Sequence, residues 1–281
     1  RGQSGRRFRR LMMGVDLLFL STGCAVYLIA GYRAVLILRG RRRPSETPLM
    51  VIALAFGTAF VLIAPSVQAL ESALLPSLGR LLSNLCTLVA AFGFAHLMLY
   101  VHHPVERVPR LVRRRLLVLL IAAAVMVTMF LLSSPPDDTG IFTGMYRSQP
   151  TLAVYTLTYS LYLGTTIIDL GWMAIGSLRH SRTWLRAGMA MIALGCVLAA
   201  GYLGQKFVSI FRELATGAVA EPFCPGAFAT VPCTFAIGMP ALSVVAIVIG
   251  IVLPTLGPRV DHAVGAVRAR GTYRRLAPLA D

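Results

Sequence analysis

The sequence predicts an all-α polytopic membrane protein, a bundle of seven transmembrane helices. Two observations of composition support this prediction: 57% of the 281 residues are hydrophobic and only 14% are charged. A soluble domain is closer to half apolar and a quarter charged, so a water-soluble fold of this composition would lack the charge to cover its surface. The third observation is that the apolar residues fall into seven long runs.

The composition also excludes two classes of protein. Hydrophobic residues are too abundant for a disordered chain. The net charge of +16 lies in short bursts of arginine between the apolar runs, not on a continuous polar face. Because a nucleic-acid-binding domain needs such a face, we do not expect nucleic acid as a partner.

Each apolar run is long enough to cross a bilayer, which takes about 20 residues in a helix. In hydrocarbon every backbone amide must be bonded within its own segment, so we expect helices. The expected spans are 11–38, 48–70, 78–101, 116–133, 151–178, 185–209 and 235–256. Together they form a transmembrane domain at 11–257, between an arginine-rich N-terminal tail at 1–10 and a basic cytoplasmic C-terminal tail at 258–281.

The runs end where a lipid-facing helix cannot continue. Prolines lack an amide hydrogen, and clustered charges are costly in lipid. The breaks include residues 39–44, Pro76, Pro104 with Pro109, 133–138, and Pro254 with Pro258. The first run is too long for a cleavable signal peptide, and no small-residue cleavage site follows it, so we expect it to remain as a span.

Arginine placement sets the expected orientation, because Lys and Arg gather in cytoplasmic loops. The connections after the first, third and fifth spans, counted with the adjoining span ends and the C-terminal tail, hold 18 of the 27 basic residues, and the other three connections, counted in the same way, hold four. We therefore expect the C-terminus inside and the N-terminus outside. Five arginines within the first ten residues oppose this orientation, since moving each charge across the membrane potential costs about 2.3 kcal/mol per 100 mV.

Two cysteines predict a disulfide bond. Cys224 and Cys233 flank a stretch bent by Pro and Gly in the connection between the sixth and seventh spans, which we assign to the outer, oxidising side. The alternatives are two unpaired thiols or a zinc pair. The zinc pair is disfavoured because that loop holds no His and no further Cys.

Polar residues within the spans define a candidate site for a small molecule. Five residues of the fifth span recur at helical spacing and share one face, and three polar residues of other spans are expected to face them. These residues are Tyr155, Tyr159, Tyr162, Thr166 and Asp169, with His96, Asn84 and Lys206. Because polar groups in lipid usually face the bundle interior, the stripe predicts one wall of a polar path. The alternative is hydrogen bonding between helices, at about 0.6 kcal/mol per bond.

The sixth span is expected to lie in the bundle centre, because it is rich in glycine and alanine. Its glycines are Gly188, Gly195, Gly201 and Gly204. Small residues let neighbouring helix backbones approach closely.

No catalytic signature occurs in the sequence. The metalloprotease motif, the nucleophile elbow and the phosphate-binding loop are all absent, so we do not expect an enzyme. A metal or haem site is disfavoured because no two histidines have the context of paired ligands, and no cofactor is expected. A proton relay between His96 and Asp169 is a further hypothesis.

Several short segments resemble a family of actinobacterial seven-helix integral membrane proteins described as transporters. The segments are 32–43, 79–85, 155–162, 184–188, Gly201 and Tyr202 with Lys206, and 273–279. The resemblance implies a transporter with a cytoplasmic C-terminal domain of unknown function, of which this chain holds only the opening residues. It implies no catalytic or ligand-binding residue.

We therefore expect a multi-pass plasma-membrane protein that moves a small molecule whose identity the sequence does not give. The alternative is a non-transporting sensor or scaffold. Its basic loops would bind a cytoplasmic protein partner or anionic lipid, at about 1 kcal/mol per basic residue near the membrane surface. Seven spans without inverted repeats depart from the usual transporter plan.

Overall fold

The computed structural model describes residues 2–40, 46–72, 75–104, 106–134, 144–178, 183–217, 231, 234–240, 242–254 and 257. Over these residues the secondary structure is helical, without strands, which confirms the all-α prediction. The chain divides into two compact units, Arg1–Ile167 with Leu203–Pro225, and Ile168–Tyr202 with Gly226–Asp281. Each unit is described by itself.

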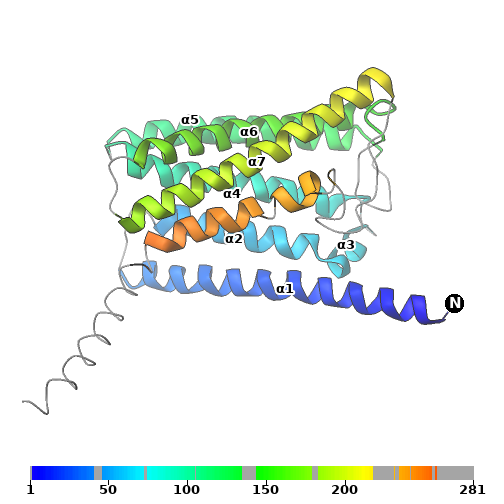
Figure 1. Ribbon diagram of the computed structural model, residues 1–281, viewed down its shortest axis with the longest axis horizontal. Coiled ribbons are helices and arrows are strands. Elements are labelled where there is room, and N and C mark those ends of the chain that lie inside the picture. The colour runs from blue at the N-terminus through cyan, green and yellow to red at the C-terminus, as the bar shows by residue number, and fades with distance from the viewer. Residues whose placement is uncertain are drawn as a thin grey trace, which may run out of the picture. The chain divides into compact units, whose positions relative to one another are not determined.

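Figure 1 shows the helices in their order along the chain. They are α1 (Gly2–Leu38), α2 (Glu46–Ile63), α3 (Pro65–Ser72), α4 (Leu78–His102), α5 (Val108–Leu131), α6 (Pro150–Ser177) and α7 (Thr183–Thr216), followed by the π-helical turn η1 (Thr234–Gly238) and a helix at Leu242–Pro254. Among the described residues α4, α5, α6 and α7 are long and apolar enough to cross a membrane. Shorter apolar helical segments lie at Phe19–Val35, Thr47–Leu62 and Leu242–Pro254, where the other three spans are expected.

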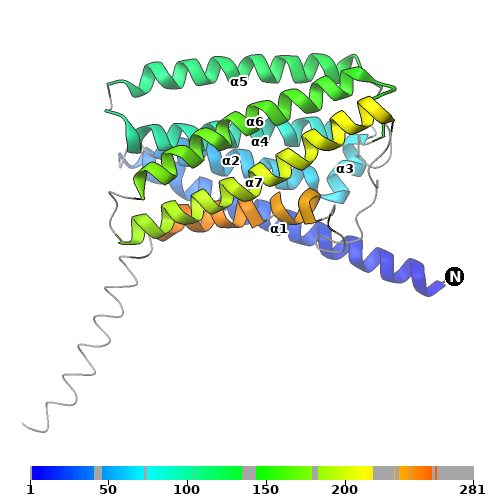
Figure 2. The ribbon, with the colours of Figure 1, turned by 45° about the horizontal axis from the view of Figure 1, so that its top comes forward.

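In the first unit α1, α2, α4 and α5 lie side by side and alternate in direction (Figures 1 and 2). Helix α2 packs against both α1 and α4, and α5 packs against α4. Glycines allow α2 to approach both α1 and α4 closely. A Cβ atom at Gly57 of α2 would lie 3.2 Å from the Tyr27 ring of α1, and one at Gly93 of α4 would lie 2.6 Å from Ile52 of α2. The Tyr27 hydroxyl also bonds the Thr58 hydroxyl at 2.8 Å.

The second expected span, 48–70, is not one helix. Helix α2 ends at Ile63 and α3 begins at Pro65, a residue that cannot donate the backbone bond that continuation would need. Asp16 of α1 stabilises the start of α3, since its Oδ1 accepts hydrogen bonds from the Ser66 amide (3.0 Å) and the Ser66 hydroxyl (2.8 Å). A carboxylate in this position satisfies an amide that has no partner within its own helix.

Three helices are longer than their expected spans. Helix α1 begins at Gly2, so residues 2–10 of the expected N-terminal tail are helical. Helix α5 begins at Val108 instead of 116, because arginine is a good helix former and Pro109 is favourable in a first turn. Helix α7 continues past 209 to Thr216 and ends at Gly217, whose φ of 68° is the left-handed conformation typical of a residue that ends a helix.

In the second unit the first half of α7 packs on the Leu242–Pro254 helix, backbone against backbone. A Cβ atom at Gly188 would lie 2.5 Å from the carbonyl oxygen of Gly250, and one at Gly195 would lie 2.9 Å from that of Ser243. The predicted close packing is therefore confirmed at Gly188 and Gly195. Gly204 belongs to the first unit, and there the prediction is wrong for the described part of the chain, in which no atom lies within 4 Å of such a Cβ.

Candidate functional site

The centre of the predicted polar stripe is a hydrogen bond between α4 and α6 in the first unit. The Asn84 amide donates from Nδ2 to the Tyr155 hydroxyl at 2.8 Å. Tyr155 is 1% exposed and packs among apolar side chains that include Leu88, Met126 and Phe130. Because a buried hydroxyl without a partner is costly, this bond fixes where α6 lies against α4.

One helical turn further along α6, Tyr159 lies beside a lysine of α7. The Lys206 Nζ atom is 5.4 Å from the centre of the Tyr159 ring, within the range of a cation–π interaction. Tyr159 is buried and Lys206 is half-buried. The lysine therefore places a positive charge next to the tyrosines of the stripe.

The next residue of the stripe, Tyr162, is buried by packing and is not open to solvent. Tyr162 is 8% exposed and belongs to the same apolar core as Tyr155 and Tyr159. The Thr166 hydroxyl bonds the Tyr162 carbonyl of its own helix at 2.9 Å. This threonine therefore bonds its own backbone, and none of the described residues of another helix bonds its hydroxyl.

His96 and Asp169, the two residues of the predicted proton relay, belong to different units. His96 of α4 is half-buried between two rings of its own helix, Phe92 at 5.9 Å and Tyr100 at 5.3 Å between ring centroids. Asp169 of α6 is half-buried in the second unit and does have an interaction partner. The contact between His96 and Asp169 stays a prediction.

The predicted disulfide lies outside the described residues, which include neither Cys224 nor Cys233. The described cysteines, Cys24, Cys86 and Cys196, are free thiols. Over the described ranges no three His, Cys, Asp or Glu side chains come together as a metal site would need.

Sequence reasoning missed Glu213, a buried carboxylate near the end of α7. Glu213 is 1% exposed, and its two oxygens accept hydrogen bonds from the backbone amides of Gly144 (2.8 Å) and Tyr146 (2.7 Å). Such bonds to a charged acceptor are short and strong. Glu213 thus fastens the segment before α6 to the end of α7. A single carboxylate in an apolar helix was the only signal in the sequence.

Arg147 lies next to the hydrogen bonds of Glu213, at the C-terminal end of α7. A Cβ atom at Gly217 would lie 2.5 Å from Nη1 of Arg147, so the guanidinium covers the C-terminal turn of α7. Carbonyl groups without intrahelical partners give this end of a helix a partial negative charge, which favours a cation there. Glu213 therefore joins the two elements by hydrogen bonds, and the exposed Arg147 side chain lies against the same end of α7.

Glu71, near the end of α3, carries a buried oxygen that none of the described residues hydrogen-bonds. This oxygen, Oε2, lies against Gly79 at the start of α4, where a Cβ atom would collide with it. Burial raises the pKa of the Glu71 carboxyl above its usual range. The side chain is therefore more easily protonated than an exposed glutamate.

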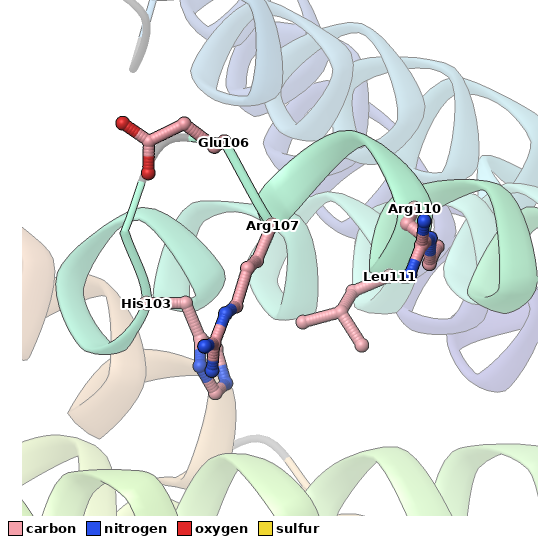
Figure 3. Close-up of a pocket in the computed structure, with 5 residues that line it drawn as sticks. All are labelled: His103, Glu106, Arg107, Arg110 and Leu111. Carbon is pink, nitrogen blue, oxygen red and sulfur yellow. The ribbon is translucent and has the colours of Figure 1, made fainter.

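A hollow of about 410 Å³ opens where α4 turns into α5 (Figure 3). It is lined by His103, Glu106, Arg107, Arg110 and Leu111. None of the eight predicted site residues lines it. The tyrosine stripe and this hollow are therefore separate features of the first unit.

Comparison with protein-family models, with curated proteins and with solved structures found no match.

Proposed function

We propose that the chain is a plasma-membrane protein that crosses the bilayer seven times, with its N-terminus outside and its C-terminus inside. Four long apolar helices and three shorter apolar segments support seven crossings. Within the first unit, the end of α1, which Arg39 follows, and the start of α5, with Arg107 just before it and Arg110 in its first turn, lie at the same end of the bundle (Figures 1 and 2). Clustering of arginine at one end supports a cytoplasmic assignment for that end.

We further propose that the protein transports a small molecule along the polar face of α6. The observation that supports this most directly is the pairing of Asn84 with Tyr155 and of Lys206 with Tyr159, two tyrosines that are buried in the apolar core of the first unit. Polar and charged groups at this depth are costly, and they usually mark a substrate path. The closed packing around Tyr162 corresponds to an occluded state, which would open during transport.

Water access to the stripe tests this proposal. A chain with its five natural cysteines replaced would carry one new cysteine, Tyr159→Cys, and would be treated in membranes with a charged, membrane-impermeant methanethiosulfonate. Transport requires that Tyr159→Cys reacts, because the stripe must become wet in part of the cycle. The matched control is Leu161→Cys on the same helix. Leu161 is 56% exposed in the protein, so in a membrane it faces lipid and its thiol should stay unreactive.

A second function is favoured by the burial of the stripe. Tyr155, Tyr159 and Tyr162 are each no more than 8% exposed, and this tight packing equally suits a sensor or scaffold whose core never opens. In that case basic loops would recruit an acidic cytoplasmic partner. A Tyr159→Cys thiol that reacts no faster than Leu161→Cys would contradict transport and favour the scaffold.

A further inference from the structure

The hollow between α4 and α5 is lined mainly by groups that carry or can acquire positive charge. Arg107 and Arg110 contribute two guanidinium groups and His103 an imidazole. Figure 3 shows the His103 and Arg107 side chains on the same side of the helix start, while the Glu106 carboxylate points away from them. Among the described residues no hydrogen bond or ion pair engages either guanidinium. Two unpaired guanidinium groups in one concave site favour an anion, and a phosphate in particular.

The fold adds a second attraction for an anion. Arg107 precedes the first turn of α5, and Arg110 and Leu111 belong to that turn. The N-terminus of a 24-residue helix carries a partial positive charge and amides without intrahelical partners. The hollow therefore combines side-chain charge with the helix dipole.

The surroundings of the hollow indicate that this anion belongs to a lipid. Within the most apolar 18-residue stretch of α5, only 22% is buried, so most of this helix faces outward. Leu117, Leu120 and Ile121 follow the arginines along the chain, and each is more than half exposed. A phosphate held by Arg107 and Arg110 would lie at the level of the headgroups, with acyl chains along these side chains.

We propose that the hollow is a binding site for the phosphate of an anionic phospholipid. The lipid occupies the leaflet at the α4–α5 end, which is the cytoplasmic leaflet in the orientation proposed above. Arg107 and Arg110 hold the phosphate, and the exposed apolar face of α5 receives the chains. Occupancy of this site does not require that the protein transports anything.

Lipid retention by the purified full-length protein tests the site. The protein in a neutral detergent is mixed with phosphatidylglycerol or with phosphatidylcholine and is studied by native mass spectrometry. We expect one phosphatidylglycerol to be retained in preference to phosphatidylcholine. The double variant Arg107→Gln/Arg110→Gln should bind it about 30-fold more weakly, from about 1 kcal/mol per basic residue.

The matched control is Arg113→Gln/Arg114→Gln. Both arginines are exposed on α5 outside the hollow, so this variant loses the same charge and should keep the lipid. Equal loss of lipid in the two double variants would overturn the proposal, because it would show diffuse attraction. Equal retention of phosphatidylcholine by the unmodified protein would overturn it as well.

Two further measurements separate a lipid from free phosphate and guard against misfolding. Inorganic phosphate in large excess should fail to displace phosphatidylglycerol, since it gains nothing from the apolar face of α5. Displacement would assign the hollow to a soluble phosphate instead. Glu106→Gln removes the negative charge at the rim and should tighten lipid binding. Unchanged or weaker binding in Glu106→Gln would contradict the site even if the arginine variants failed to fold.

Discussion

Replacing Glu213 by alanine should release the segment before α6 from the end of α7. The carboxylate is 1% exposed and accepts two backbone hydrogen bonds, from Gly144 and Tyr146. Alanine keeps the helix but removes both acceptors at once. The two amides then respond differently, because Tyr146 is buried and Gly144 is exposed.

The magnitude follows from that difference in burial. A hydrogen bond to a charged group contributes about 1.5–3 kcal/mol, and a buried donor left without a partner costs about 1–3 kcal/mol. Water can replace the lost acceptor at Gly144 but not at Tyr146. We therefore expect the local opening free energy to fall by about 3 kcal/mol, which makes the Tyr146 amide exchange about 100-fold faster.

Hydrogen–deuterium exchange followed by mass spectrometry measures this effect directly on peptides that cover residues 144–149. Glu213→Gln should give a smaller increase, since its carbonyl oxygen still serves one of the two amides. Glu106→Ala is the control, because this carboxylate is exposed and bonds none of the described residues. If amide exchange at residues 144–149 stays unchanged in Glu213→Ala, Glu213 does not hold the segment before α6 against α7.

Three further predictions concern stability in detergent, measured as the midpoint of thermal unfolding by circular dichroism. Gly195→Ala should destabilise the second unit because a Cβ atom meets backbone, whereas Gly204→Ala, with none of the described atoms near its Cβ, should stabilise α7 by about 1 kcal/mol. Glu71→Gln should raise the unfolding midpoint at neutral pH, because burial raises the pKa of this carboxyl and disfavours its charged form. The gain should vanish as the pH falls below 4.5, the ordinary pKa of a glutamate carboxyl. A gain that does not depend on pH would argue against burial as the cause. Tyr155→Phe should cost about 1 kcal/mol by leaving the Asn84 amide without its acceptor, and a smaller loss in the Asn84→Ala background would confirm the coupling.

The helical segments are largely predictable from the sequence, because the apolar runs have the length of a bilayer. Their ends are less predictable. The fourth span is expected to begin at 116, after Pro104 and Pro109, yet α5 begins at Val108, since proline is favourable in a first turn and arginine is a good helix former. Pro65 divides the second expected span, and the new helix that begins there is stabilised by the Asp16 carboxylate of α1, which accepts hydrogen bonds from Ser66, 50 residues further along the chain.

In the candidate site, too, local features could be predicted from the sequence, and contacts between distant residues could not. Helical periodicity places Tyr155, Tyr159 and Tyr162 on one face, and all three are buried. Periodicity does not identify the partner of each tyrosine. It also does not reveal Glu213, whose bond to Tyr146 joins residues 67 positions apart. Long-range hydrogen bonds of single residues leave no local pattern, so they emerge only when the helices are packed.

Seven crossings with a cytoplasmic C-terminus are tested most directly by paired fusions of green fluorescent protein and alkaline phosphatase. Fusions after residues 43, 110, 181 and 281 should fluoresce, and fusions after residues 75, 140 and 220 should show phosphatase activity, since each reporter works on one side of the membrane only. Phosphatase activity from a fusion after residue 281, or two successive fusion points on the same side, would contradict the proposed topology.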